Sequence, residues 1–342
     1  MSEHIKLTQF SSSSGCGCKI HPEELEEIIK DLKTGVNYPN LIVGNDSSDD
    51  ASAMKLPNGD LLIQTSDFFT PIVDDPFLFG QIAAANALSD VFAMGGKPLM
   101  ANALLGWPTD KLSPEIANQV LRGAIEICNQ VNIPLAGGHS IKIQEPIFGL
   151  SVTGICSPSQ LKTNSAANPG DSIYLTKPIG TGILASALKK GKLNEEGLKA
   201  LLKITTKVNS EGLLFGNLHY VNAMTDVTGF GFLGHLLEMC RGANLGAEII
   251  SSSIPVIEEA KALAAQFIMP DNTYRNWNAF EKQTTNLPAD LFALVNDPQT
   301  NGGLMVAVDS NFTTNFEAFC KENEIQIYKI GVFVNGEGVN FK

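Results

Sequence analysis

The stretch that decides the fold is "PSQLKTNSAANPGD", residues 158 to 171, which is polar and carries two prolines and one glycine. It separates a strand-like run, "PIFGLSVTGIC" (146–156), from another strand-like run, "SIYLTKP" (172–178). Polar segments with proline and glycine between apolar runs are typical of loops and linkers. The stretch therefore predicts a boundary between two folded halves.

Length and composition agree with two folded halves. A chain of 342 residues exceeds the usual size of a single core, and its 44% hydrophobic and 18% charged residues are a globular composition. We expect an N-terminal arm over 1–45, one domain over 46–157 and a second over 158–342.

Both halves alternate helical and strand-like patterns, which predicts a mixed α/β (α+β) fold with two domains. Helices are expected at about 76–94, 114–131, 181–190, 194–218, 231–241, 256–267 and 312–322. Strands are expected at "LMANALLGW" (99–107), "IPLAGG" (133–138), "GAEII" (246–250), "LMVAV" (304–308) and "IQIYKIGVFV" (325–334).

The charge balance argues against polyanionic partners. With 24 Lys and Arg against 36 Asp and Glu, the formal net charge of −12 repels nucleic acid and anionic membranes. Residues 1–10 lack the apolar core of a signal peptide, and no run reaches the roughly 18 apolar residues of a membrane span. We expect a cytoplasmic protein that binds neither nucleic acid nor membrane.

Cysteine usage agrees with a reducing compartment. The six cysteines are too few and too scattered for a disulfide framework, so thiols are expected. Four of them lie in apolar surroundings and are expected to be buried, namely Cys128, Cys156, Cys240 and Cys320.

Two thiols and a lysine follow a serine tract in "SSSSGCGCKIH" (11–21). Such a tract buries little apolar surface, so Cys16 and Lys19 are expected on a flexible arm that closes over a site. Zinc binding by Cys16, Cys18 and His21 is an alternative, but no fourth ligand follows at a structural zinc spacing. A Cys16–Cys18 disulfide would be strained and labile.

Two carboxylates end the arms of an expected hairpin, "DDASAMKLPNGDLLIQTSD" (49–67). A two-residue turn at Asn58-Gly59 would place Asp50 opposite Asp67. Like charges in that position repel, so a cation between them would be needed. The alternative is that both aspartates are solvated in loops at the open end.

A third carboxylate lies on an apolar helix, in "FGQIAAANALSDVFAMGG" (79–96). Asn86 and Asp90 share one face, and Asp90 lies near the helix C-terminus, where the dipole disfavours negative charge. A solvent-facing stripe would explain these residues, but the helix is apolar on most sides. A buried Asp90 needs a partner, and a hard cation would serve.

A fourth carboxylate, Asp226, lies in "AMTDVTGFGFLGH" (223–235). Its three glycines match the spacing of a dinucleotide fingerprint, but "HYVNAMTD" is a poor strand and no acidic residue follows at the required distance. A second glycine-rich segment, "LAGGHS" (135–140), could cradle a phosphate through Gly138 and Ser140. A tight structural turn containing His139 is the alternative.

Carboxylates from separate segments and anion-cradling turns together suggest a polyphosphate held through Mg²⁺. ATP and carboxylates repel each other, and divalent cations reverse that interaction. Lys19 would then add a mobile positive charge.

The assembled motifs resemble selenophosphate synthetase, the selenide, water dikinase family. They are "GCGCK" (15–19), "VGNDSSDDA" (43–51), "NALSD" (86–90), "LAGGHS", "MTDVTGFGFLGHL" (224–236) and "DPQTNGGL" (297–304), in order along nearly the whole chain. Asn301 stands where many members have serine. Aminoimidazole ribonucleotide synthetase and thiamine monophosphate kinase share the two-domain fold but lack the Cys-Gly-Cys-Lys arm.

The resemblance implies conversion of ATP, selenide and water to selenophosphate, AMP and orthophosphate, with Mg²⁺ and K⁺. It also implies a homodimer, in which strands of the N-terminal halves form a shared β-barrel, and leaves room for a selenium-delivery protein. The implied catalytic residues are Cys16 and Lys19. The implied Mg²⁺ ligands are Asp50, Asp90 and Asp226. The implied ATP contacts are Lys19, Ser47, Ser48, Asp49, Asp67, Asp90, Gly138, His139 and Ser140, the last three across the dimer.

Two rival functions stay open. A superfamily relative could phosphorylate another metabolite, although the Cys-Lys arm argues against that. An ATP-binding paralogue could carry selenium without turnover, but such a paralogue would be free to lose the residues above.

Overall fold

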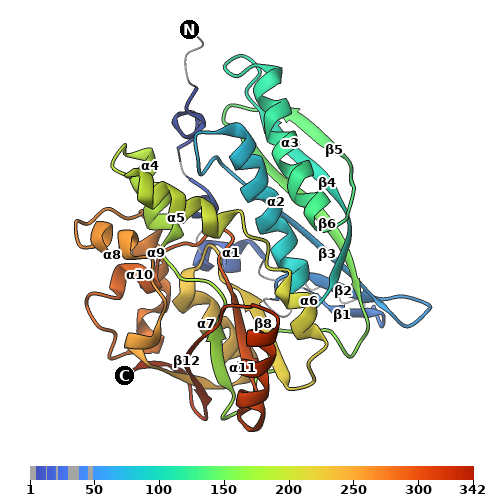
Figure 1. The fold of residues 1–342 in the computed structure, drawn as a ribbon, viewed down its shortest axis with the longest axis vertical. Coiled ribbons are helices and arrows are strands. Elements are labelled where there is room, and N and C mark those ends of the chain that lie inside the picture. Colours follow the sequence, from blue (N-terminus) through green and yellow to red (C-terminus); the bar gives the residue numbers. More distant parts are fainter. Residues whose placement is uncertain (1–4, 13, 21, 30–37, 45–48) are drawn as a thin grey trace.

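A computed structural model describes residues 5–12, 14–20, 22–29, 38–44 and 49–342 of the chain (Figure 1). Ser47, Ser48 and His21, which the sequence analysis singled out, lie outside the described residues. The described residues form two sheets with helices, so the mixed α/β prediction is confirmed. None of the described helices is both long and apolar enough to cross a bilayer.

The first sheet has six strands in the order β1-β2-β3-β6-β4-β5. Only β4 and β5 pair in parallel, and the other neighbours are antiparallel. The strands are β1 (Leu41–Val43), β2 (Ser52–Lys55), β3 (Leu61–Phe69), β4 (Lys97–Trp107), β5 (Leu135–Lys142) and β6 (Ile147–Cys156).

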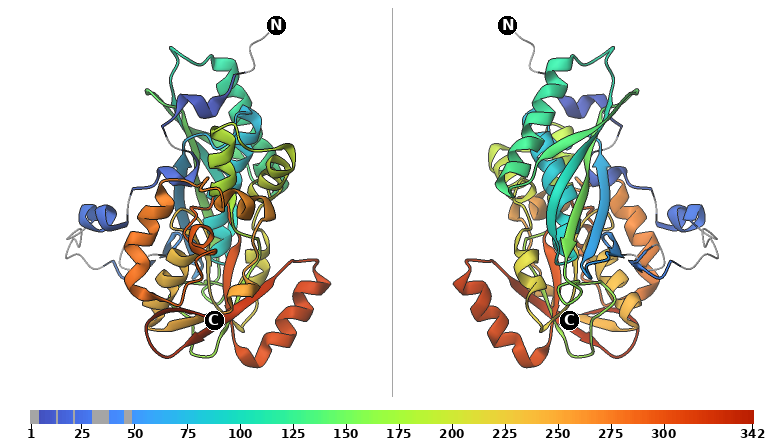
Figure 2. Two further views of the ribbon diagram at one scale, coloured as in Figure 1. Left: turned by 90° about the vertical axis from the view of Figure 1, so that its left-hand side faces the viewer. Right: turned by 90° about the vertical axis from the view of Figure 1, so that its right-hand side faces the viewer.

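Helices α2 (Pro76–Ala93) and α3 (Pro114–Gln130) pack together on one side of this sheet (Figures 1 and 2). The two helix backbones approach each other very closely at two glycines. A Cβ atom on Gly80 would lie 1.9 Å from the carbonyl oxygen of Val120, and a Cβ atom on Gly123 would lie 1.9 Å from the carbonyl oxygen of Phe77. Only glycine permits that approach. The opposite face of the sheet exposes apolar side chains, including Met54, Phe68 and Met100.

Helix α2 begins with a cap and ends at a glycine. Asp75 accepts a hydrogen bond from the Leu78 backbone N–H at 2.9 Å, and Pro76 occupies the first turn. The helix stops at Met94, followed by Gly95 with φ of 71°. Its residues from Phe79 onward are almost all buried, so the predicted apolar environment of this helix is confirmed.

The second sheet has seven strands in the order β10-β13-β9-β12-β7-β11-β8. They are β7 (Ser172–Leu175), β8 (Val221–Asp226), β9 (Gly246–Ile249), β10 (Thr284–Thr285), β11 (Leu304–Val308), β12 (Tyr328–Val334) and β13 (Gly338–Phe341). The accompanying helices are α4 (Thr181–Lys189), α5 (Glu195–Thr205), α6 (Glu211–Gly216), α7 (Gly231–Ala243), α8 (Glu258–Ala264), α9 (Asn272–Phe280), α10 (Phe292–Val295) and α11 (Thr313–Glu322).

Two expectations for the second half are wrong, and helix α9 was missed. The expected helix 194–218 is two helices, α5 and α6, separated by residues 206–210. Helix α9 was not expected, because its apolar pattern is weak. The segment "HYVNAMTD" was expected to be a poor strand, yet residues 221–226 form β8, a largely buried strand at the edge of the sheet beside β11.

Helix α2 also contacts β8, α5 and α6, and so lies between the two sheets. A Cβ atom on Gly212 of α6 would fall 2.2 Å from the Phe92 carbonyl oxygen, so the two helices meet through backbone. The polar residues of α2 therefore lie at the junction of the two halves, where β8 ends at Asp226.

The described part of the N-terminal arm folds onto both halves. Before β1 it contains the short 3-10 turns η1 (Leu7–Phe10) and η2 (Cys16–Cys18), and helix α1 (Pro22–Ile29). Leu7 is fully buried, and the Thr8 backbone N–H donates to Asp74 Oδ1 at 3.2 Å. The Gly15 N–H donates to the Thr70 carbonyl at 3.1 Å, just beyond β3.

Candidate active site

Three aspartates from distant segments meet where α2 and β8 approach. Asp50 precedes β2, Asp90 lies in the last turn of α2, and Asp226 is the final residue of β8. Asp90 accepts a hydrogen bond from the Thr65 hydroxyl at 2.5 Å, and Asp50 from the Thr225 hydroxyl at 2.8 Å. Asp90 and Asp226 are buried, as the sequence analysis expected for Asp90.

Burial and mutual repulsion raise the pKa of all three carboxyl groups. Burial is the largest cause in each case. For Asp50 the charges of Asp226 and Asp90 raise the pKa further, and for Asp90 those of Asp226 and Asp67 do so. Such repulsion indicates that these carboxylates lie near enough to one another for their charges to interact.

The oxygen atoms left without partners fit a divalent cation. Asp50 Oδ2 and Asp226 Oδ2 are buried and have no hydrogen-bond partner in the protein. Hard carboxylate oxygens are ligands that Mg²⁺ prefers, and a cation here would offset the cost of burying the charges. The residues present therefore fit Mg²⁺.

The cluster is not a complete cage. Among the residues that the structure describes, no three His, Cys, Asp or Glu side chains form a ready metal-binding group. Mg²⁺ is usually held by one or two carboxylates together with waters and substrate phosphates rather than by protein alone. The arrangement therefore suits a metal that arrives with a nucleotide.

Asp67 lies beside this cluster, on β3. The Asn86 side chain of α2 donates to Asp67 Oδ2 at 2.5 Å, and Asp67 raises the pKa of Asp90 and Asp226 through its charge. Together the four aspartates collect negative charge from β3, α2, β8 and the segment before β2.

The predicted pairing of Asp50 with Asp67 is wrong. Ser52 pairs with Gln64 and Lys55 with Leu61, so the turn contains three residues, Pro57 to Gly59, rather than two. Proline cannot donate to a ladder, so the loop is longer by one residue and the register shifts. Asp50 lies before β2 and meets Asp226 and Asp90 instead, while Asp67 pairs with Leu150 of β6.

Asp49 contacts the segment between the two halves. Its Oδ1 accepts the backbone N–H of Asn164 at 2.8 Å. This hydrogen bond ties the chain before β2 to residues 157–171, and so fixes where Asp50 can lie.

The arm brings positive charge to the cluster. Lys19 lowers the pKa of Asp90 and Asp226 by its charge, and it opposes the rise that burial causes in the pKa of the Cys18 thiol. The Asn272 side chain of α9 donates to the Gly17 carbonyl at 2.7 Å and holds this segment in place. Cys16 begins η2, and the position of its thiol lies outside the described residues.

Gly138, His139 and Ser140 do not form the expected glycine-rich turn. They lie within β5, an exposed edge strand that pairs with β4, with Gly138 opposite Ala103. Strands β6 and β4 separate β5 from β3, which places these residues about 14 Å from Asp67 at the usual strand spacing. Within one chain they do not join the aspartate cluster.

Sequence reasoning missed several polar residues that support the cluster: Thr65, Ser89, Asn164, Lys177, Asn209 and Thr225. The Ser89 hydroxyl lowers the pKa of the Asp226 carboxyl. One signal in the sequence indicates a buried amine at this place: Lys177 lies in the apolar run "SIYLTKP".

Comparisons with known proteins extend over both halves. The family model "AIR synthase related protein, N-terminal domain" matches residues 48–156, and the corresponding C-terminal domain model matches residues 168–342. The curated selenide, water dikinase of Enterobacter sp. (strain 638) is 47% identical over 339 residues, covering 99% of this chain and 98% of its own. That of Escherichia coli (strain K12) has the same identity and coverage.

The chain belongs to the selenide, water dikinase family. The resemblance inferred from the motifs is thereby confirmed. The fold is shared more widely: the solved structure of AaThiL complexed with AMPPCP and TMP has a TM-score of 0.71 at 18% identity, covering 95% of this chain and 96% of that one. The selenide, water dikinase fold is therefore the two-domain fold that the sequence predicted.

Proposed function

We propose that this protein makes selenophosphate, AMP and orthophosphate from ATP, selenide and water. The observation that carries the proposal is the convergence of Asp50, Asp67, Asp90 and Asp226 with the arm that bears Lys19, in a member of the selenide, water dikinase family. The rival function, phosphorylation of another metabolite, rests on fold similarity at 18% identity alone.

Asp50, Asp90 and Asp226 would hold Mg²⁺ together with the phosphates of ATP. Bound Mg²⁺ supplies positive charge that neutralises the nucleotide and stabilises the charge that develops during phosphoryl transfer. The partnerless oxygens of Asp50 and Asp226 support this assignment. We carry K⁺ over from the family as a second cofactor, to be tested by replacing K⁺ with Na⁺.

The arm would complete the site. Lys19 would stabilise negative charge on the transferred phosphoryl group, since its charge already acts on Asp90 and Asp226. Cys16 would act through its thiolate, the reactive form of a thiol, at the side of the site that the arm covers. Asp67, Asp49, Ser47 and Ser48 would contact ATP.

A homodimer would explain the position of the "LAGGHS" segment. Gly138, His139 and Ser140 lie on an edge strand with an unpaired side, and the uncovered sheet face exposes Phe68 and Met100. Edges and apolar faces of this kind favour pairing with a second copy. We propose that strands from two subunits form a shared barrel and that "LAGGHS" reaches ATP across it, in a cytoplasmic enzyme.

The direct test is anaerobic incubation with ATP, Mg²⁺ and selenide, followed by ³¹P NMR. We expect AMP, orthophosphate and a selenium-dependent phosphorus signal. ADP in place of AMP, or no such signal, would overturn the proposal. Asp90→Asn and Lys19→Met should abolish the signal, whereas Asp110→Asn, which changes an exposed carboxylate, should not. A fully active Cys16→Ser variant would remove only the role of the thiol.

A further inference from the structure

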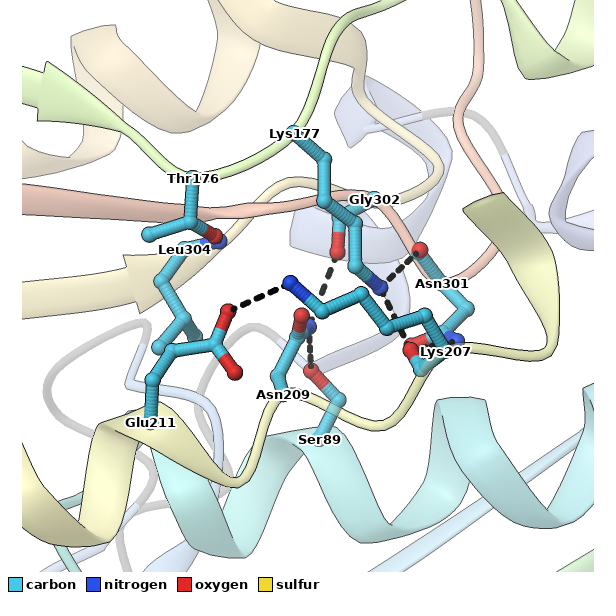
Figure 3. Close-up of polar contacts among 9 residues, drawn as sticks. All are labelled: Ser89, Thr176, Lys177, Lys207, Asn209, Glu211, Asn301, Gly302 and Leu304. Carbon is cyan, nitrogen blue, oxygen red and sulfur yellow. Dashed lines mark hydrogen bonds and ion pairs between the residues drawn. The ribbon is translucent and has the colours of Figure 1, made fainter. Parts of the chain in front are cut away.

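A buried lysine outside the aspartate cluster lies at the centre of a polar network (Figure 3). Lys177 is 3% exposed and directly follows β7 and Thr176. Its ammonium donates to the carbonyl oxygens of Lys207 at 2.7 Å and Asn301 at 3.0 Å. Burial lowers the pKa of this amine to about 7, while the charges of Glu211 and Asp226 oppose the shift. Burying an amine is costly, so its retention calls for a reason.

The first hydrogen-bonded route from Lys177 ends at Asp67. The carbonyl group of Asn301 accepts from Lys177, and the backbone N–H of Asn301 donates to Asn86 Oδ1 at 2.7 Å. Because that bond fixes the orientation of the Asn86 amide, its nitrogen points at Asp67 Oδ2, 2.5 Å away. The route runs from the loop before β11, through α2, to β3.

The second route ends at Asp226. The Asn209 side chain donates both amide hydrogens, one to the Gly302 carbonyl and one to Ser89 Oγ, each at 2.8 Å (Figure 3). Since Ser89 Oγ accepts from Asn209, its own hydrogen is free to be donated to Asp226. The second route therefore orients the Ser89 hydroxyl, which lowers the pKa of the Asp226 carboxyl.

Both routes start on residues 301–302, and that loop has little room to move. Asn301 adopts φ of 47°, and its side chain donates to the carbonyls of Thr205 at 2.7 Å and Lys207 at 2.9 Å. A Cβ atom on Gly303 would lie 2.4 Å from the backbone nitrogen of Lys177, and one on Gly302 would lie 2.2 Å from the Val227 carbonyl oxygen. The Lys177 ammonium joins residues 207 and 301 at the point where this loop meets the turn between α5 and α6.

We infer that Lys177 is a positioning residue for Asp67 and Asp226, which it aligns through the backbone of Asn301 and Gly302 and the amides of Asn86 and Asn209. The ligand that benefits is the magnesium–triphosphate group, and this part of the inference rests on the proposed function. Lys177 touches neither carboxylate and takes no part in the chemistry.

The experiment measures binding of magnesium with the ATP analogue AMPPCP to the full chain by calorimetry, with no selenide present. Lys177→Met keeps most of the apolar stem and removes the two hydrogen bonds. We expect the dissociation constant to rise about tenfold or more, the range seen when groups that orient metal ligands are removed. The apparent half-saturation for Mg²⁺ should rise with it.

Lys162→Met is the matched control. Lys162 is also buried and donates to two carbonyl oxygens, those of Leu218 at 3.1 Å and Val221 at 2.7 Å, but Val221 lies at the opposite end of β8 from Asp226. The Lys162→Met variant should lower the unfolding temperature about as much as Lys177→Met does. It should leave the dissociation constant for magnesium–AMPPCP unchanged. The contrary result is that Lys177→Met reduces only the fraction of protein that can bind, with the dissociation constant for magnesium–AMPPCP unchanged. That result would show that the inference is wrong.

A second variant keeps the test decisive if Lys177→Met does not fold. Ser89→Ala removes one hydroxyl from the second route, and it should weaken magnesium–AMPPCP binding without changing the unfolding temperature by more than a few degrees. Unchanged binding in Ser89→Ala would overturn the second route. Wild-type protein that binds magnesium–AMPPCP but makes no selenophosphate would overturn the proposed function and leave this inference standing.

Discussion

The backbone N–H of Asn301 donates to Oδ1 of Asn86 across 2.7 Å, although 215 positions separate the two residues in the chain. One belongs to the loop that leads into β11 and the other to α2, which packs on the first sheet. The orientation of the Asn86 amide, and with it the hydrogen bond to Asp67, is thus set by the other half of the chain. Four predictions concern this junction and the elements around it.

Removal of the buried charge of Asp90 should make the metal-free protein more stable, although it should abolish selenophosphate synthesis. Asp90→Asn preserves an acceptor for the Thr65 hydroxyl and removes a charge that burial and Asp226 disfavour. We expect metal-free protein to gain about 1 kcal/mol or more in unfolding free energy at pH 7, since each unit of raised pKa is about 1.4 kcal/mol. Denaturant unfolding without Mg²⁺ measures this gain. A less stable Asp90→Asn variant would contradict the account of the cluster.

Asp297 should make stability depend on pH. Burial raises the pKa of this carboxyl to about 8, even though Gly182 and Gln299 donate hydrogen bonds to it. The folded state therefore holds a proton that the unfolded chain loses near pH 4, so stability from this group falls as pH rises from about 4 to about 8. Asp297→Asn should flatten that slope.

Urea unfolding of wild-type and Asp297→Asn protein at several pH values provides the measurement. As pH rises from about 4 to about 8, the unfolding free energy of the wild-type protein should fall relative to that of Asp297→Asn. Parallel pH profiles for the two proteins would show that Asp297 is not protonated in the folded state.

The close approach of α2 and α3 should not tolerate a methyl group. In Gly123→Ala the new Cβ atom would fall 1.9 Å from the Phe77 carbonyl oxygen, so the helices must separate. We expect a loss of about 1–3 kcal/mol, as for other overpacked sites. Gly137→Ala is the control, because its Cβ atom meets nothing nearer than 3.5 Å. Equal unfolding midpoints for both variants in urea would refute the steric argument.

The bond between α9 and the arm should control access to the Cys18 thiol. Asn272→Ala removes the donor to the Gly17 carbonyl, so the segment around Cys18 should open more often. We expect iodoacetamide to alkylate Cys18 several-fold faster, read by mass spectrometry of the peptide. Asn323→Ala, which removes an exposed side-chain bond to the Phe319 carbonyl on α11, should leave the rate unchanged. A rate unaffected by Asn272→Ala would mean that other contacts hold the arm.

Sequence patterns predicted those features that depend on local chemistry. The apolar run around Asp90 was long enough to indicate a helix buried on most sides, and the anomaly of a carboxylate near its end indicated a partner. Patterns of prolines, glycines and apolar runs also divided the chain into two mixed halves. These signals hold because burial periodicity and turn chemistry act within a few residues.

The missed features depend on contacts between distant residues or on small differences in turn geometry. Pro57 lengthened the hairpin loop by one residue, and that shift removed the expected pairing of Asp50 with Asp67. The segment after α5 has a helical composition, but the chain is not helical at Asn209. The Asn209 side chain donates hydrogen bonds to Ser89 and to the Gly302 carbonyl. The role of Lys177 could not be seen either, because its acceptors lie 30 and 124 positions away.

The placement of α2 between the two sheets limits how the protein can be divided. Its apolar side chains pack on the first sheet, while Asn86 and Ser89 accept hydrogen bonds from Asn301 and Asn209 of the second half. A fragment ending near residue 157 would expose that polar row beside a wide apolar surface, and the remaining fragment would lack the helix that covers β8. A chimeric protein that joins the two halves of different relatives near residue 157 would therefore fold only if the residues of α2 and those of the second half that contact α2 remain compatible.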